Sequence, residues 1–196
     1  TGVTQSLDIP ILAPVLIGRA PQLDALNHLV ARAATSRGQT ALIAGGLYGI
    51  ERELELCGLG KTPEERQATA REYFDRQREA LVAGFSSAPE ILFVASARNA
   101  NQDSTFAEAI PAGIALPNLV TVGAVDKAGD EAPFTSYGPT VKLHANGYQV
   151  ESTLPGGDRV ALSGTSMSAP QVTGLAAKLL AVRPRLTPPE LIAIMV

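Results

Sequence analysis

Apolar residues recur at helical spacing in one segment of the first half of the chain. Leucines and a valine at 23, 26, 29 and 30 predict a helix from about Pro21 to Ala34. A second helix begins after Thr62, which suits an N-cap, with Pro63 at the first helical position and Glu65 completing a capping box. We expect it to continue to about Val82.

Two more helices are predicted near the C-terminal end. Proline is tolerated only near the start of a helix, so Pro170 places the beginning of the third helix close to Ser166. Gly164 permits a sharp entry from the preceding strand, and apolar residues at 172, 175, 176, 179 and 180 form a buried stripe. The segment "TPPE" at 187–190 repeats the start signal of the second helix.

Three short segments between the helices are apolar throughout rather than alternating. They cover residues 40–45, 90–96 and 118–125, and this pattern is typical of strands buried on both faces of a parallel sheet. After Phe134 the pattern changes to Thr/Tyr/Val stretches with Gly-rich turns, such as 154–160, which predict antiparallel hairpins. The order of elements predicts an α/β sandwich with a mainly parallel sheet, as one domain over residues 1–196.

Composition narrows the function classes. The 196 residues carry a net charge of −3 and a calculated pI near 5.4, so we expect neither a nucleic-acid nor an anionic-membrane partner. The single cysteine, Cys57, excludes an intrachain disulfide and a Cys-rich metal site. The longest apolar stretch, 9–17, is interrupted by Pro10 and Pro14 and is too short to span a bilayer.

The stretch "SGTSMSAPQVTG", residues 163–174, contains the candidate chemistry. A serine at a helix N-terminus lies beside unpaired backbone N–H groups in a field that favours negative charge, as acyl transfer through an oxyanion requires. On position alone, the favoured interpretation is that Ser166 or Thr165 is only an N-cap, because such caps are common. An α/β-hydrolase elbow is excluded because Ser168 replaces its final glycine. The glycines of "AGGLYG" at 44–49 have the wrong offsets for a dinucleotide loop.

Four segments together resemble the subtilisin-like serine proteases (subtilases, peptidase family S8). "GTSMSAP" is similar to the family's nucleophile motif Gly-Thr-Ser-Met-Ala-x-Pro, and "LFVASARN" at 92–99 resembles its strand ending in Ala-Ala-Gly-Asn. "IPAGIALPNLVTVGAVD" at 110–126 and "FTSYGPTVKLHANG" at 134–147 resemble two further family segments. The four occur in family order and spacing over roughly residues 85–183.

The resemblance implies a subtilisin-like three-layer sandwich and a serine endopeptidase acting on peptides or proteins. By motif position, Ser166 is the nucleophile, and the side chain of Asn99 with the Ser166 backbone N–H forms the oxyanion hole. The wall residues of the S1 pocket, which holds the substrate side chain next to the scissile bond, are Ala95, Ser96 and Ala97 on one side and Gly45 and Gly46 on the other. The helix at 63–83 is an insertion or an enlarged crossover helix.

The family's triad Asp and His motifs are absent from the chain. The histidines and the isolated aspartates receive no triad role: these are His28, His144, Asp8, Asp103 and Asp158. We interpret the chain as an N-terminally truncated catalytic domain that is inactive alone, with the remainder of the domain supplying Asp and His. Many relatives bind calcium, but no loop here matches a ligand pattern, so no cofactor or metal is assigned. A secreted or cell-envelope location follows from the resemblance only.

Four departures from the family pattern leave a second function open. Arg98 replaces the glycine before the oxyanion Asn, where a large side chain is expected to restrict the turn that aims Asn99. The segment at 44–49 lacks the usual Ser-[Trp/Phe/Leu]-Gly, while Gln171 and Asn146 replace a His and a Pro. The alternative is therefore a non-catalytic subtilase-like module that binds peptides or acts as a scaffold.

Overall fold

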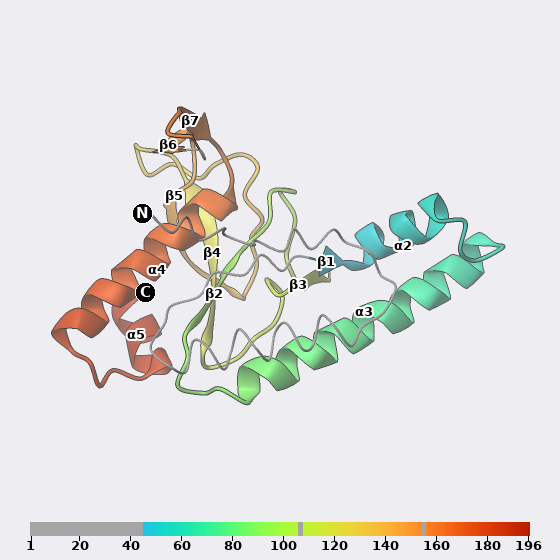
Figure 1. The fold of residues 1–196 in the computed structure, drawn as a ribbon, viewed down its shortest axis with the longest axis horizontal. Coiled ribbons are helices and arrows are strands. Elements are labelled where there is room, and N and C mark those ends of the chain that lie inside the picture. The colour runs from blue at the N-terminus through green and yellow to red at the C-terminus, as the bar shows by residue number, and fades with distance from the viewer. Residues whose placement is uncertain (1–44, 106–107, 154–155) are drawn as a thin grey trace, which may run out of the picture.

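A three-stranded parallel sheet forms the centre of the molecule (Figure 1). The structure, a computed structural model, describes residues 45–105, 108–153 and 156–196. Strands β2 (Phe93–Ser96), β4 (Leu119–Val125) and β5 (Val141–Asn146) lie in the order β2-β4-β5. Six of the seven residues of β4 are buried, as expected for a strand covered on both faces. The parallel strands predicted at 90–96 and 118–125 are confirmed.

Helices cover the two faces of this sheet, which gives the three-layer α/β sandwich that the sequence predicted. On one side α4 (Thr165–Val182) packs against all three strands, with α5 (Pro188–Met195) beside it (Figure 1). On the other side a core cluster joins α2 (Leu47–Leu56) and α3 (Pro63–Ser86) to Ala95 and Leu119 of the sheet. The carboxyl ends of β2 and β5 lie at the same edge of the sandwich as the N-terminus of α4.

The predicted start of α3 is confirmed in detail. The Thr62 hydroxyl accepts a hydrogen bond from the backbone N–H of Glu65 at 3.2 Å, and Pro63 is the first helical residue. The helix ends at Ser86, four residues beyond the predicted Val82, because Phe85 is buried in the core cluster and prolongs the apolar face.

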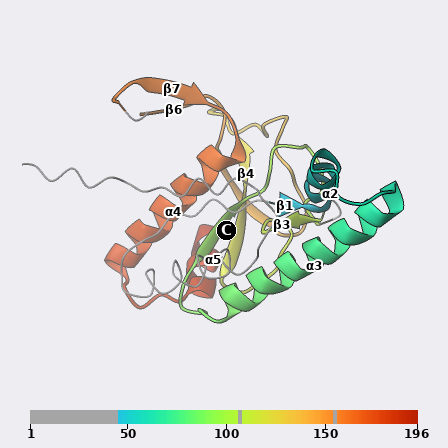
Figure 2. The ribbon, with the colours of Figure 1, turned by 45° about the vertical axis from the view of Figure 1, so that its right-hand side comes forward.

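The sequence analysis missed α2. Its N-cap, Gly46, is extended with φ −176°, and the helix follows the glycines directly. The signal was the pair Ile50 and Leu54, four residues apart and both buried against α3. Figure 2 shows α2 and α3 as a helical pair beside the sheet.

Two small antiparallel sheets complete the described fold. β1 (Gly45–Gly46) pairs with β3 (Ala109–Ile110), and β6 (Val150–Thr153) pairs with β7 (Arg159–Leu162) as a hairpin. The hairpin confirms the antiparallel prediction for that region.

The same prediction was wrong for β5, which pairs in parallel with β4. Its alternating burial resembles that of a hairpin strand, because it lies at the edge of the sheet among the described strands. The predicted helix at 21–34 and residues 40–44 of the predicted strand lie outside the described residues. Among the helices that are described, none is long and apolar enough to cross a bilayer.

Candidate active site

Gly164 is the N-cap of α4, so the interpretation of Thr165 or Ser166 as a cap was wrong. Gly164 has φ +156°, and its N–H donates to the carbonyl of Gly147 at 2.7 Å. Thr165 and Ser166 are therefore the first two helical residues. Pro170 is the sixth, and without an N–H it leaves the carbonyl of Ser166 without its usual intrahelical donor.

The hydroxyl groups around this N-terminus differ in their partners. The Ser163 hydroxyl accepts from the backbone N–H of Gln149 at 2.9 Å, and the buried Ser168 hydroxyl donates to the carbonyl of Ala145 at 3.0 Å. In contrast, Ser166 is exposed, and its hydroxyl has no hydrogen-bond partner among the described residues. Ser166 alone of these three serines combines solvent access with an unengaged hydroxyl.

Asn99 lies against the same N-terminus, just beyond the carboxyl end of β2. Its Oδ1 accepts hydrogen bonds from the backbone N–H of Thr165 at 2.9 Å and from the Thr165 hydroxyl at 3.0 Å. Two donors on one atom fix the orientation of the amide, so the Nδ2 group faces away from Thr165. Nδ2 has no acceptor among the described residues, and a β-carbon at Gly164 would lie only 3.0 Å from it.

The backbone around Asn99 is held by the segment 134–136. The Arg98 carbonyl accepts from the N–H of Ser136 at 3.0 Å, and the Ala100 N–H donates to the Ser136 hydroxyl at 3.3 Å. The Asn101 N–H donates to the carbonyl of Phe134 at 3.0 Å. These bonds, with those from Thr165, fix Asn99 on both its main chain and its side chain. Thr165 and Ser136 were not identified as positioning residues from the sequence, because their partners are distant along the chain.

Together these groups form a site that suits a developing negative charge. The N–H of Ser166 has no backbone acceptor at the start of α4, and the helix dipole adds partial positive charge there. The Nδ2 group of Asn99, which lies near Gly164 at the same helix end, is a second kind of donor without an acceptor among the described residues. Donors without acceptors at a helix N-terminus can stabilise negative charge with little reorganisation.

Arg98 occupies a backbone conformation that favours glycine, with φ +79°. The turn nevertheless forms, and the Asn99 side chain after it is hydrogen-bonded to Thr165. The Arg98 side chain extends toward β1, where a β-carbon at Gly46 would lie 2.9 Å from Nη1 and 3.5 Å from Cζ of Arg98. The Arg98 side chain therefore reaches from the end of β2 to Gly46, between the two segments that were predicted as opposite walls of one pocket.

Three residues in and directly after β2, which were predicted to form one wall of the S1 pocket, differ in burial. Ser96 is half-buried, whereas Ala95 and Ala97 are 5% and 0% exposed. Ala95 belongs to the core cluster, so any contribution it makes to a substrate pocket comes from its backbone.

Residues that were given no triad role lie in other settings. The His144 imidazole packs over Gly123 of the neighbouring strand, and the Asp103 carboxylate accepts from the N–H of Thr105 at 2.8 Å. Asp158 is exposed before β7. None of the three is hydrogen-bonded to Ser166, while His28 and Asp8 lie outside the described residues.

The described parts of the chain contain no group of three or more His, Cys, Asp or Glu side chains placed to share a metal ion.

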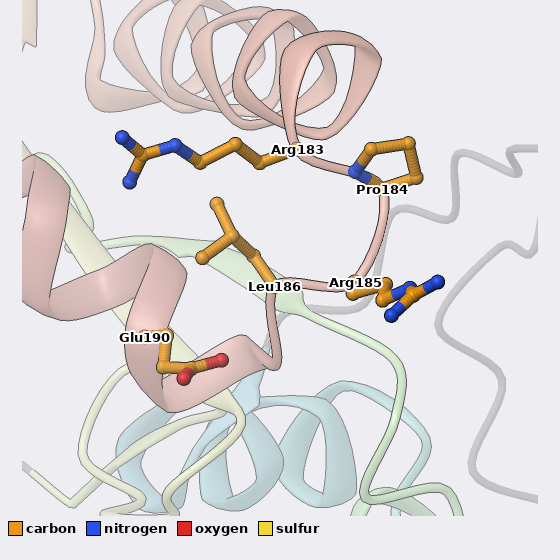
Figure 3. A pocket seen from close by; sticks show the side chains of 5 residues that line it. All are labelled: Arg183, Pro184, Arg185, Leu186 and Glu190. Atoms are coloured by element: carbon orange, nitrogen blue, oxygen red, sulfur yellow. The ribbon is translucent and has the colours of Figure 1, made fainter.

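A shallow pocket lies at the opposite end of α4 from Ser166, in the turn to α5 (Figure 3). Its lining residues are Arg183, Pro184, Arg185, Leu186 and Glu190. It is therefore separate from the site at Ser166 and Asn99.

The chain belongs to the subtilase family of peptidases. Residues 36–196, which include the whole described site, match the sequence profile of that family. The resemblance of the four motifs is thereby confirmed.

Individual relatives agree with this assignment. The chain is 38% identical over 140 residues to a subtilase-type proteinase of Saccharomyces cerevisiae, covering 68% of this chain and 28% of the relative. It is 29% identical over 173 residues to a subtilisin of Bacillus pumilus, covering 88% and 59%. The crystal structure of a cold-adapted subtilisin-like serine proteinase matches with 33% identity and a TM-score of 0.54, covering 59% of this chain and 41% of that one.

The chain spans only 28% and 59% of the length of the yeast and Bacillus relatives. The comparisons therefore establish the family and the fold.

Proposed function

We propose that this chain carries the nucleophile half of a serine endopeptidase active site. The Ser166 hydroxyl gives its proton to the general base and attacks the carbonyl carbon of a peptide bond. The C–N bond then breaks, the amine leaves with the proton, and an acyl-enzyme ester remains. Water attacks this ester, which releases the acid and restores the Ser166 hydroxyl. The Ser166 backbone N–H and the Asn99 amide hold the oxyanion in both steps.

The observation that carries this proposal is the pair of hydrogen bonds from Thr165 to Oδ1 of Asn99. They turn the amide donors of Asn99 away from Thr165, at the helix end that presents Ser166. The exposed and unengaged Ser166 hydroxyl supports the same assignment, since Ser163 and Ser168 are both hydrogen-bonded.

The proposal requires a general base that the described residues do not offer. We propose that a His and an Asp from outside this chain complete the triad. Losing the base alone costs about as much as losing the whole triad in a protease of this family, on the order of 10⁶ in turnover. Residues 1–196 alone are therefore expected to hydrolyse peptides negligibly.

The substrate is a peptide or protein, and the proposed reaction requires no cofactor. We propose no nucleic-acid or membrane partner. For the complete protein we propose a secreted or cell-envelope location.

A non-catalytic, peptide-binding module is the second candidate. Arg98 favours it, because an arginine with φ +79° at the turn before Asn99 departs from the glycine of the family motif. The proteinase is favoured because Asn99 is still held with its donors available, an arrangement that a pure binding module does not need.

The test is peptide hydrolysis by the complete polypeptide that contains this chain. Ser166→Ala is expected to reduce turnover on the order of 10⁶-fold, to near the uncatalysed level. Ser163→Ala is the matched control and should retain activity, since Ser163 is an exposed residue whose hydroxyl accepts a bond from the N–H of Gln149. Hydrolysis that persists in Ser166→Ala, or that is absent from the unaltered protein, would reject the proteinase.

A further inference from the structure

We propose that Arg98 selects substrates with an acidic side chain at P1, the residue whose carbonyl is attacked. This inference rests on the proposed function, because it assumes that Asn99 holds the carbonyl oxygen of that residue. It adds to that function a substrate class and the residue that determines it.

On the proposed function, a P1 side chain would lie next to Arg98. The P1 side chain branches from the carbon directly bonded to the attacked carbonyl, so it is held within a few ångströms of the Asn99 amide. Arg98 directly precedes Asn99, and its side chain runs from the end of β2 to β1, with Nη1 2.9 Å from a β-carbon built at Gly46. Because Gly46 has no side chain, the guanidinium can pack directly against it.

The charge of Arg98 is not neutralised in the described part of the molecule. Its guanidinium makes no hydrogen bond or ion pair with any described residue. Glu108 is close, since its carbonyl oxygen lies 3.6 Å from the same β-carbon position at Gly46. The Glu108 carboxylate, however, is bound by both terminal nitrogens of Arg71, with Nη2 to Oε2 at 2.7 Å. The nearby acid is thus engaged by a second arginine.

The chemistry of the guanidinium points to a carboxylate. Its planar fork of N–H donors matches the two oxygens of a carboxylate in a bidentate pair, and such charge-assisted bonds are among the strongest in proteins. Arg98 is also half-buried, so water screens its charge less than that of a fully exposed side chain. A neutral P1 side chain would leave this charge unpaired, whereas P1 Glu or Asp would pair it.

The alternative is that Arg98 only fills the space beside Gly46, which would favour small P1 residues. The two roles separate in a panel of peptides that differ only at P1, with Glu, Gln, Ala or Leu, assayed with the complete polypeptide. We expect kcat/KM for P1 Glu to exceed that for P1 Gln by about 10- to 100-fold, since the pair differs in charge and hardly in size. Equal values for Glu and Gln, or the highest value for Ala, would overturn the proposal.

Variants of Arg98 show whether this side chain is responsible. Arg98→Gln removes the charge and is expected to bring the Glu/Gln ratio close to one, while Arg98→Lys keeps the charge without the fork and should retain part of it. Raising the ionic strength should lower the ratio in the unaltered protein. A ratio that Arg98→Gln leaves unchanged would contradict the assignment.

Fluorophosphonate labelling of Ser166 in each variant reports an intact site independently of P1. If Ser166 of the unaltered protein is labelled but hydrolysis shows no preference for P1 Glu, this inference is overturned and the proposed function is not. If neither labelling nor hydrolysis of any panel peptide occurs in the unaltered protein, the proposed function fails, and this inference fails with it.

Discussion

The side-chain oxygen of Asn99 accepts hydrogen bonds from both the backbone N–H and the hydroxyl of Thr165, at 2.9 and 3.0 Å. One residue at the start of α4 thereby orients a residue that is 66 positions earlier in the chain. The two segments belong to different layers of the fold, the end of a parallel strand and the beginning of a helix. Their contact places the amide donors of Asn99 at the helix end that presents Ser166.

The amide of Asn99 is predicted to act mainly in the transition state. Asn99→Ala should lower kcat by about 10²–10³, the range typical for removing one oxyanion donor in a protease of this family, with little change in KM. Steady-state kinetics of the complete polypeptide measure both constants. An increase in KM with an unchanged kcat would mean that Asn99 binds substrate without stabilising the oxyanion.

Thr165 is predicted to be a positioning residue. Thr165→Val removes the hydroxyl bond to Asn99 but keeps the backbone bond and the side-chain volume, so kcat should fall by about three- to tenfold, as expected for one lost hydrogen bond. Thr165→Ser retains the hydroxyl and is the matched control. In the Asn99→Ala background, Thr165→Val should have almost no further effect on kcat. An equally large loss in both backgrounds would show that Thr165 acts only on stability.

Gly164 is predicted to be intolerant of any side chain. It has φ +156°, and a β-carbon there would lie 3.0 Å from Nδ2 of Asn99. Gly164→Ala should therefore lower the free energy of unfolding by about 1–3 kcal/mol and also reduce kcat through displacement of the amide.

A helical glycine elsewhere provides the control for that variant. Gly49 in α2 is exposed, and a β-carbon there meets no atom within 4 Å. Gly49→Ala should raise the free energy of unfolding by about 0.5–1 kcal/mol and leave kcat unchanged. Denaturant unfolding and steady-state rates measure both variants, and similar behaviour of the two would contradict the geometry at Gly164.

The sequence predicted those elements whose signals are local. Thr62, Pro63 and Glu65 are neighbours that mark a helix start by themselves, and α3 begins there. The largely apolar run at 118–125 was predicted for a similar reason, since burial on both faces removes the alternation of apolar and polar positions.

The elements that were missed depend on distant partners. β5 alternates like a hairpin strand, and only its pairing with β4 makes it parallel. α2 is supported by Ile50 and Leu54, whose apolar partners lie on α3. In the site, the family motif indicated Ser166 and Asn99. The side chain of Arg98 beside Gly46 was not predictable, because the family motif has glycine at that position and offers no side chain to place.

The ion pair between Arg71 and Glu108 is predicted to stabilise the fold in a pH-dependent way. The hydrogen bond from Arg71 lowers the pKa of Glu108 below its ordinary value of 4.5. A lowered pKa in the folded state stabilises the protein above the unfolded pKa, and this contribution is lost as the pH falls through the folded pKa. Both side chains are more than a third exposed, at 44% and 35%, so we expect no more than about 1 kcal/mol at pH 7.

Arg71→Gln tests this pair. The free energy of unfolding of the variant should be slightly below that of the unaltered protein at neutral pH. The two should converge as the pH falls below about 4.5, and also at high salt. Denaturant titrations across this pH range measure the difference in free energy of unfolding. A difference that stays constant at acidic pH would show that Arg71 acts through packing.

The central claim is that Ser166 is the nucleophile and that its base comes from outside residues 1–196. Reaction with a fluorophosphonate followed by peptide mass mapping tests both parts at once. We predict one stoichiometric adduct, on Ser166, in the complete polypeptide, and no appreciable labelling of residues 1–196 alone. An adduct on a different serine, or rapid and complete labelling of Ser166 in the isolated chain, would contradict the account.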